Sequence, residues 1–351
     1  MSTATALPPP STLVGRKLPR WTPAALVAGA LAIAGMLAVL GPADSIEGFV
    51  LWTGSLFLIG QTIASFAVEG GRHARDRLVT SLIYTSFVIT VIPLVSVLIL
   101  TIKNGMARFD SSFFSSSLRN IAATNAGGGA YHALVGTIEQ VLIATAFAVP
   151  VGIFVAIYLV EFGKGGFART VSTFVDVMTG LPSIVAGLFI LSFWILALGQ
   201  GYSGFAGSLA LAILMLPIVV RSTEEMLRLV PDALREASYA LGVPRWKTIV
   251  RIVIPTALPG IVTGVMLGVA RVAGETAPVL LVTFGTNSIN TDPFSGPQSS
   301  LPLFVYQQAG LPNQVAIDRA WTGALTLILF VMLLNLAARL VTYFWRARMG
   351  R

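Results

Sequence analysis

The sequence predicts an all-α integral membrane protein with about eight transmembrane helices. Of its 351 residues, 55% are hydrophobic and only 11% are charged, and the mean hydropathy is +0.82. Too few polar residues remain to cover the surface of a soluble globule of this length. Several apolar runs are also long enough to cross a bilayer, which takes about 20 helical residues. The order of these runs therefore decides the architecture.

Spans are predicted at about residues 24–40, 49–68, 78–102, 133–160, 171–198, 205–220, 255–284 and 321–345. The first run follows a basic start, so a signal peptide is the alternative to a span. No convincing small-x-small cleavage site follows it, and we interpret it as a span. Residues 1–20, with three consecutive prolines at 8–10, are typical of a disordered tail.

The basic residues indicate the orientation. With the N-terminus in the cytoplasm, seventeen Lys and Arg fall inside and four outside, which agrees with the positive-inside rule and an even number of spans. Both termini are then cytoplasmic, and topology rather than nucleic-acid binding explains the net charge of +8. The four outside are Lys103, Arg108, Arg119 and Arg319. The chain has no cysteine and two histidines, which excludes disulfides and predicts no metal site.

The loop between the sixth and seventh spans has the start and stop signals of a short helix. Pro231 suits a first helical turn, Gly242 suits a left-handed cap, and Pro244 prevents continuation. We expect a small-residue face, on which another protein can close, at Ala233, Ala237 and Ala240. We expect hydrated surroundings from Arg228, Arg235, Arg245 and Lys247.

Here the chain resembles the permeases of ABC-type importers, whose signature is EAA, three residues, G, nine residues and I-x-L-P. The match is Glu236, Ala237 and Ser238, then Gly242, then Ile252 to Pro255, with Ser for the second Ala and Ile for Leu. The alternative is a plain cytoplasmic hairpin. The resemblance implies a loop, 221–254, that lies in a groove of a separate ATP-binding subunit.

No G-x-x-x-x-G-K-[ST] phosphate loop occurs in the sequence. We therefore expect a transport subunit that is not itself an enzyme and has no cofactor of its own, with ATP and Mg bound by a partner subunit. The resemblance implies a type I importer core of six helices at 78–345, preceded by two extra helices at 21–77 and followed by a basic C-terminus at 346–351.

The seventh span carries a stripe of small and charged residues. Gly260, Gly264 and Gly268 recur every four residues, and Arg271 and Glu275 continue at steps of three and four. Glycines at this spacing permit close helix packing, so we expect the stripe to face the bundle and to take the charged pair with it. An Arg at the bilayer centre costs about 2.5–3.5 kcal/mol, so such residues usually face a partner or a pathway.

Two interpretations of the charged pair remain open. Arg271 and Glu275 can neutralise each other and hold helices together, although Arg before Glu is the less favourable order at this spacing. Alternatively, Arg271 offers planar donors to a tetrahedral oxyanion. Glu275 then accepts a hydrogen bond from a protonated phosphate oxygen, which fully deprotonated sulfate does not have.

The segment from Ala270 to Pro278 closely resembles the A-R-x-x-G-E-T-A-P segment of phosphate importer permeases. Residues 181–188 and 217–224 resemble the same family, and residues 127–129 and 157–161 favour its A-type subunit, PstA, over the C-type. The resemblance implies that Arg271, Glu275 and Arg221 take part in phosphate passage, together with the flanking Gly274 and Thr276. For Glu139 and Asp176 we expect helix-packing or interfacial roles instead.

The partners implied are a C-type (PstC-like) permease, two copies of a PstB-like ATP-binding subunit and an external PstS-like phosphate-binding protein. The location implied is the bacterial cell (inner) membrane. Three alternatives remain. The chain could be a permease for molybdate, sulfate or phosphonate, or a membrane subunit that also serves phosphate sensing. It could also be a secondary transporter, in which the 221–254 loop would have no ATP-binding subunit to contact.

Overall fold

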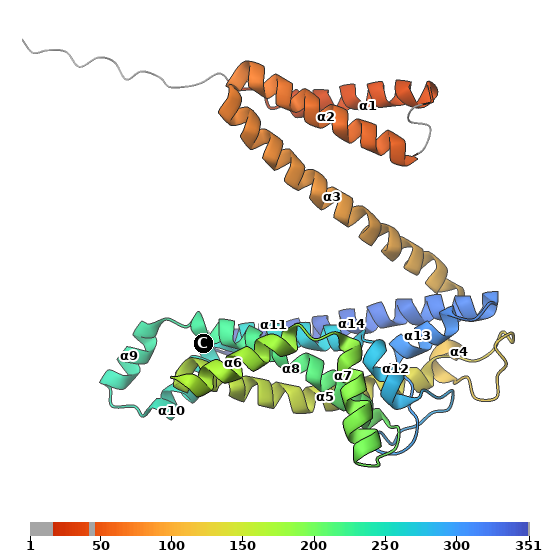
Figure 1. The fold of residues 1–351 in the computed structure, drawn as a ribbon, viewed down its shortest axis with the longest axis vertical. Helices are drawn as coiled ribbons and strands as arrows, with labels where there is room; N and C mark the ends of the chain where they lie inside the picture. The colour runs from red at the N-terminus through yellow and green to blue at the C-terminus, as the bar shows by residue number, and fades with distance from the viewer. Residues whose placement is uncertain (1–16, 42–45, 350–351) are drawn as a thin grey trace, which may run out of the picture. The chain divides into compact units, whose positions relative to one another are not determined.

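The structure is a computed structural model that describes residues 17–41 and 46–349, without the side chains of 46, 47, 341, 342 and 344–349. Within these residues the fold is helical, apart from one isolated bridge between Phe284 and Gln298. The first sixteen residues of the predicted tail over 1–20, and the side chains of the last three basic residues, Arg346, Arg348 and Arg351, lie outside the described part. The all-α fold class is confirmed (Figure 1).

The chain forms two compact units, Met1–Leu98 and Ile99–Arg351. The first contains α1 (Thr22–Val39), α2 (Ile46–Glu69) and most of α3 (Gly71–Gly105). The first part of the second unit contains η1 (Met106–Arg108), α4 (Ser111–Ser115), α5 (Tyr131–Ile157), η2 (Tyr158–Phe162), α6 (Gly166–Thr179), α7 (Ser183–Ile190) and η3 (Leu191–Ala197). It continues with α8 (Gly204–Arg228), α9 (Asp232–Ala240), α10 (Arg245–Thr248), η4 (Ile249–Val253), α11 (Ile254–Ala273), α12 (Ala277–Thr283), α13 (Leu301–Ala309) and α14 (Gln314–Met349). The predicted domain limits stay a prediction.

Among the described residues, seven helices are long and apolar enough to span a membrane, or eight if α6 and α7–η3 count as one span. The predicted span over 171–198 is wrong in one respect, because these two parts meet at a bend of 106°. Pro182 explains the bend: it has no N–H to donate to Met178, and it disfavours helical conformation in Leu181. A helix cannot continue through this position.

The predicted span over 255–284 is also interrupted. Helix α11 ends at Ala273, and α12 begins at Ala277 after three residues that belong to neither helix. Pro278 lies in the first turn of α12 and has no N–H to donate to Gly274, so the hydrogen-bond ladder stops there. The break places Glu275 in a loop rather than on a helix.

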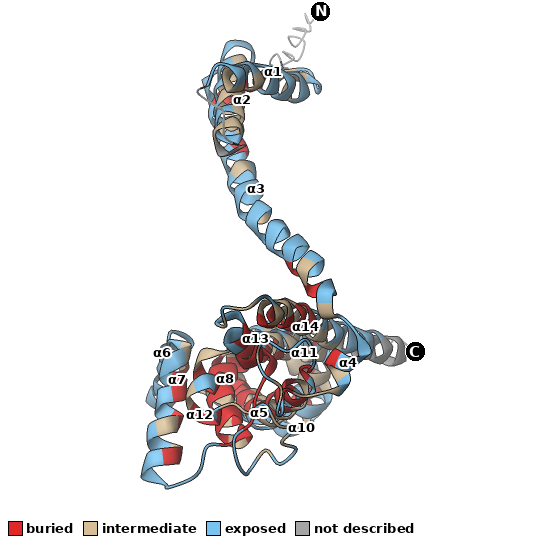
Figure 2. Ribbon diagram, turned by 90° about the vertical axis from the view of Figure 1, so that its right-hand side faces the viewer, coloured by how far each residue is buried: buried red, intermediate tan, exposed pale blue. Residues whose placement is uncertain are grey.

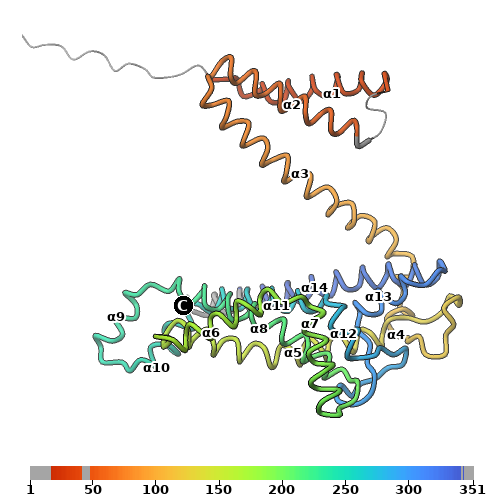
Figure 3. The backbone as a smooth tube through the Cα atoms, in the orientation of Figure 1, coloured from red at the N-terminus to blue at the C-terminus, as the bar shows by residue number. Residues whose placement is uncertain are grey.

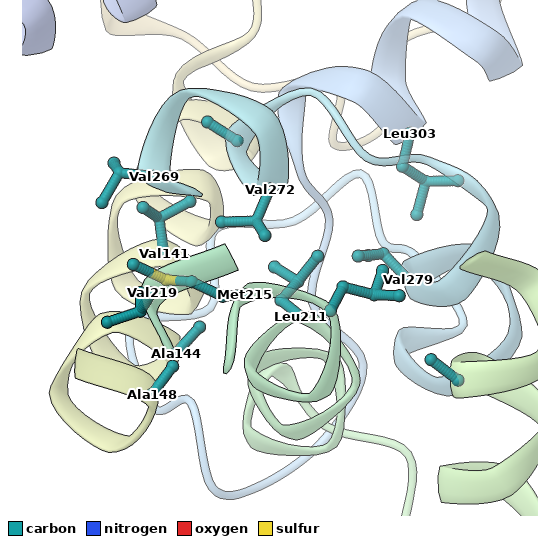
Figure 4. Packing of buried hydrophobic residues seen from close by; sticks show 13 residues of the cluster. Val141, Ala144, Ala148, Leu211, Met215, Val219, Val269, Val272, Val279 and Leu303 are labelled. Carbon is teal, nitrogen blue, oxygen red and sulfur yellow. The ribbon is translucent and has the colours of Figure 1, made fainter. Parts of the chain in front are cut away.

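Helix α8 is the centre of the second unit. In its most apolar stretch of 18 residues, 61% are buried, the largest share among the candidate spanning helices described. Figure 2 shows buried residues on α5 and α8. Met215 and Val219 of α8 pack with Ala144 of α5 and Val269 of α11 (Figure 4). The close approach of α5 requires Gly152, where an added Cβ would lie 2.7 Å from Val219 Cγ1. In Figure 3, α9 and α10 lie at one end of this unit and α13 and α4 at the other.

Candidate functional site

The glycine stripe of α11 faces α8, as predicted. A Cβ added at Gly260 would collide with Met226, and one at Gly264 with Ser222. At Gly268 an added Cβ would make an ordinary contact, 3.4 Å from Met215 Cγ. Gly260 and Gly264 therefore let two spanning helices approach closely, whereas Gly268 lies on the same face with room for a Cβ.

Arg271 does not follow this stripe into the bundle, so that expectation was wrong. Its side chain is 61% exposed, whereas the next residue, Val272, is buried in the core. Successive steps of four residues continue from Gly268 to Val272, and Arg271 is turned about 100° away from Val272 on the helix. Arg271 therefore presents its guanidinium on the outer surface of this chain.

Glu275 lies in the break after α11 and is closer to the interior. Its side chain is 18% exposed, and its Oε1 lies 3.8 Å from Arg271 Nε. The carboxylate also borders a cavity of about 10 Å³, room for about one water molecule. Gly274 is exposed, and Thr276 is half-buried at the start of α12 with no side-chain capping bond. The break thus holds a loosely paired carboxylate beside an exposed guanidinium.

A polar network that sequence reasoning missed surrounds this cavity. Gln140 and Ser300 line the cavity, and the buried Gln140 Oε1 and Ser300 Oγ have no hydrogen-bond partner among the described residues. Gln140 Nε2 donates to Gln298 Oε1 at 3.0 Å, and Gln298 Nε2 donates to Glu139 Oε2 at 2.5 Å. The sequence signal for this network was Gln140, an amide side chain within the apolar run of the predicted fourth span. Glu139 here joins α5 to the 285–300 segment, in agreement with its predicted packing role.

Arg221 is not brought together with Arg271. It faces α6, where it donates to Ser172 and pairs with Asp176 at 2.5 Å. It also pairs at 2.5 Å with Glu224 of its own helix. The neighbouring Ser222 faces Gly264, seven residues or about 10 Å along α11 from Arg271. Arg221 therefore fastens α6 to α8 in this structure, and its role in phosphate passage stays a prediction.

The predicted cytoplasmic helix is α9, and its N-terminal boundary differs by one residue from the expectation that Pro231 lies in the first turn. Pro231 directly precedes it in extended conformation, and Gly242 follows with φ +74, the left-handed region that suits glycine. Glu236 and Ala237 are exposed, as are Ala233 and Ala240. Large apolar side chains nearby are exposed as well: Leu229, Leu234, Tyr239, Leu241 and Trp246. Pro255 lies in the first turn of α11, after η4. This end of the molecule presents a mixed polar and apolar surface.

Arg235 was predicted to hydrate this loop, and that prediction was wrong. Its side chain is only 13% exposed and pairs at 3.0 Å with Glu161 of η2, whose side chain is 4% exposed. The guanidinium also donates to the carbonyl oxygens of Leu227 and Val230, at 3.0 and 2.6 Å. These contacts tie α9 to the ends of α5 and α8. The loop sequence could not show this burial, because the carboxylate partner of Arg235 lies 74 residues away in the sequence.

Ser238 is the buried member of the EAA-like motif. Its Oγ lies 2.8 Å from Thr248 Oγ1, and both side chains are buried. The hydroxyl pair joins α9 to α10 across the turn that contains Gly242. Glu236 and Ala237 thus face outward, while Ser238 stabilises the hairpin from inside.

Comparisons with known proteins place these features in a family. The sequence pattern described as "Binding-protein-dependent transport system inner membrane component" matches residues 148–351. A "Phosphate transport system permease protein PstA 1" of Mycobacterium tuberculosis (strain CDC 1551 / Oshkosh) is 51% identical over 273 residues, 78% of this chain and 90% of that protein. The PstA of Mycobacterium leprae (strain TN) is 51% identical over 76% of this chain and 88% of that protein.

A solved structure supports the fold alone. A crystal structure of a bacterial alginate ABC transporter, in complex with an alginate pentasaccharide-bound periplasmic protein, matches with a TM-score of 0.53. The match covers 75% of this chain and 93% of that chain, at 15% sequence identity. The helical arrangement of an ABC importer permease is therefore present at low sequence identity.

Proposed function

We propose, from the premise that this chain belongs to the binding-protein-dependent transport permeases and within them to the PstA group, that it forms one half of the translocation pathway of an ATP-driven phosphate importer. A chain with seven or eight candidate spans can line a pathway. The observation that carries the choice of phosphate is the Arg271–Glu275 pair at the break after α11. The relatives named as phosphate permeases support the same choice.

The chemistry of the pair suits a protonated tetrahedral oxyanion. A guanidinium binds two oxygens of phosphate with parallel N–H donors. The loose 3.8 Å separation leaves both groups of the pair available for a ligand. Glu275 accepts a hydrogen bond from the P–OH group, and a sulfate oxygen in that place would set two negative charges against each other. The pair therefore attracts the anion and favours its protonated form over a fully deprotonated one.

The exposure of Arg271 also bears on the partner. A charged side chain that is 61% exposed on a spanning helix is costly against lipid, and such residues usually face a partner or an aqueous pathway. A second, C-type permease packed against this side of α11 removes Arg271 from lipid and places it between the two subunits. The pathway then runs along the interface, with Gly274 and Thr276 in its wall.

Coupling to ATP is assigned to α9 and its flanking turns. Two copies of a separate ATP-binding subunit hydrolyse MgATP, and one of them binds the exposed Glu236 and Ala237 with the apolar residues around them. Because Arg235 and Ser238 anchor the hairpin, motion of the ATPase moves the ends of α5 and α8 with it. An external phosphate-binding protein delivers the anion from the opposite side. The chain resides in the bacterial inner membrane with both termini in the cytoplasm.

The test is uptake by the reconstituted complex in proteoliposomes. We expect labelled phosphate to accumulate when ATP is supplied on the ATPase side, at a rate that ionophores leave unchanged. Molybdate and phosphonate should compete poorly. Uptake that requires an ion gradient instead of ATP, or that prefers molybdate, sulfate or phosphonate, would overturn the proposal.

A further inference from the structure

The first unit contains a cavity that the proposed transport function does not use. It has a volume of about 450 Å³ and lies where α2 ends and α3 begins. Thr62 and Phe66 line it from α2. The first turns of α3 contribute Gly71, Arg72, Ala74, Arg75 and Leu78.

Two cross-links between α2 and α3 hold the walls of this cavity. Near the turn, Arg77 donates to Glu69 Oε1 at 2.7 Å, and its Nε lies 2.6 Å from Glu69 Oε2. Farther from the turn, Gln61 Nε2 donates to Ser81 Oγ at 3.0 Å, and both side chains are buried. The cavity is therefore built into the helix pair.

The cavity carries a local excess of positive charge. Arg77 is neutralised by Glu69, whereas Arg72 and Arg75 form no ion pair with a described residue. Asp76 is the nearest acidic residue along α3, and it is exposed and likewise unpaired within the described chain. Two free guanidinium groups offer the planar donors that phosphate oxygens prefer.

One wall of the cavity is apolar and leads toward the membrane interior. Phe66 is 66% exposed, and beyond Leu78 the exposed Leu82 and Ile83 continue along α3. One candidate span ends at Glu69 and the next begins at Gly71. Whichever side of the membrane this turn faces, the cavity thus lies where headgroups meet hydrocarbon.

We propose that this cavity binds an anionic phospholipid, with the headgroup phosphate on Arg72 and Arg75 and an acyl chain along Phe66 and Leu78. Basic pockets between spanning helices suit such headgroups. Free inorganic phosphate would use the arginines but gain nothing from the apolar wall. The site therefore selects a lipid, and it is independent of the phosphate pathway in the second unit.

Native mass spectrometry of the assembled transporter tests the proposal. The complex is placed in nanodiscs of phosphatidylcholine with or without phosphatidylglycerol, and the retained phosphatidylglycerol is counted. For Arg72→Gln/Arg75→Gln we expect roughly thirty-fold weaker retention, since each basic residue near the surface contributes about 1 kcal/mol. The exposed pair Lys164→Gln/Arg169→Gln removes the same charge from the start of α6 and the turn before it, and should retain the lipid.

Two further arms separate the alternatives. Phe66→Ser keeps both arginines and should also weaken retention, because the acyl chain loses its wall. Inorganic phosphate added to the wild-type complex should not displace the lipid. Equal losses in both double variants, full retention in Arg72→Gln/Arg75→Gln, full retention in Phe66→Ser, or displacement by inorganic phosphate would each overturn the proposal.

Discussion

At the residue scale, the Arg235–Glu161 pair links the α9 hairpin to the bundle through buried charged groups. Both side chains are largely buried, and Arg235 also satisfies two backbone carbonyl groups. Removing one partner of a buried pair leaves the other charge uncompensated, which typically costs about 3–5 kcal/mol. If α9 meets the ATPase as proposed, the pair also has a mechanical role, because it joins α9 to the ends of α5 and α8.

We therefore expect Arg235→Met to lower the thermal unfolding midpoint of the purified complex strongly. Glu161→Gln/Arg235→Met, which removes both charges, should recover part of the loss. Arg169→Met is the matched control, since Arg169 is exposed and unpaired within the described chain. Equal midpoints for Arg235→Met and the control would show that the pair contributes nothing to stability.

At the element scale, α9 depends on the turn that follows it. Gly242 has φ +74 and open space around its Cα, so any side chain there meets backbone strain rather than a collision. The strain amounts to roughly 1–2 kcal/mol. It would shift the C-terminal end of α9, where Leu241 and Trp246 are exposed.

Gly242→Ala is accordingly expected to reduce both phosphate uptake and co-purification of the ATP-binding subunit, by roughly 5- to 30-fold for strain of about 1–2 kcal/mol. Gly165→Ala is the control, because Gly165 also has positive φ and open surroundings but lies outside the hairpin. Normal attachment of the ATPase to the Gly242→Ala complex would contradict the role given to this turn.

The elements that sequence predicted well depend on local signals. Gly242 caps α9 as expected, and Pro231 lies one residue before the helix instead of in its first turn, because caps and breakers act within a few residues. Pro278 indicates the break after α11, but the length of the apolar run led to the prediction of a single span over 255–284. The anchoring of Arg235 and the outward turn of Arg271 were not predictable locally. Glu161 is distant in the chain, and the α8 surface that buries Val272 is fixed only by packing.

At the scale of the whole molecule, the distribution of basic residues predicts the orientation on which the coupling and pathway assignments depend. The chain has no cysteine, so single substitutions can be labelled without background. Ser295 lies between the predicted spans over 255–284 and 321–345, on the side predicted to be outside, and Lys164 lies between the spans over 133–160 and 171–198, on the predicted cytoplasmic side; both are exposed. The two positions therefore report on opposite sides of the membrane.

In intact cells, a membrane-impermeant maleimide should label Ser295→Cys but not Lys164→Cys. After permeabilisation both should react. Labelling of Lys164→Cys in intact cells would reverse the orientation and place α9 where no ATPase can reach it.

The proposed transport of phosphate depends most on Glu275, which is proposed to select a protonated phosphate beside Arg271. A hydrogen bond to a charged group is worth about 1.5–3 kcal/mol, or roughly 10- to 100-fold in rate. Glu225→Gln is the control, since this glutamate is exposed on α8 and forms no ion pair within the described residues.

The most direct measurement is ATP-driven uptake of phosphate and of sulfate by the reconstituted complex carrying Glu275→Gln. Assays with and without the external binding protein separate its selectivity from that of the membrane pathway. We predict a loss of phosphate uptake of at least roughly tenfold and weaker discrimination against sulfate, with the Glu225→Gln complex unchanged. Unchanged phosphate uptake and unchanged discrimination against sulfate in Glu275→Gln would contradict this prediction.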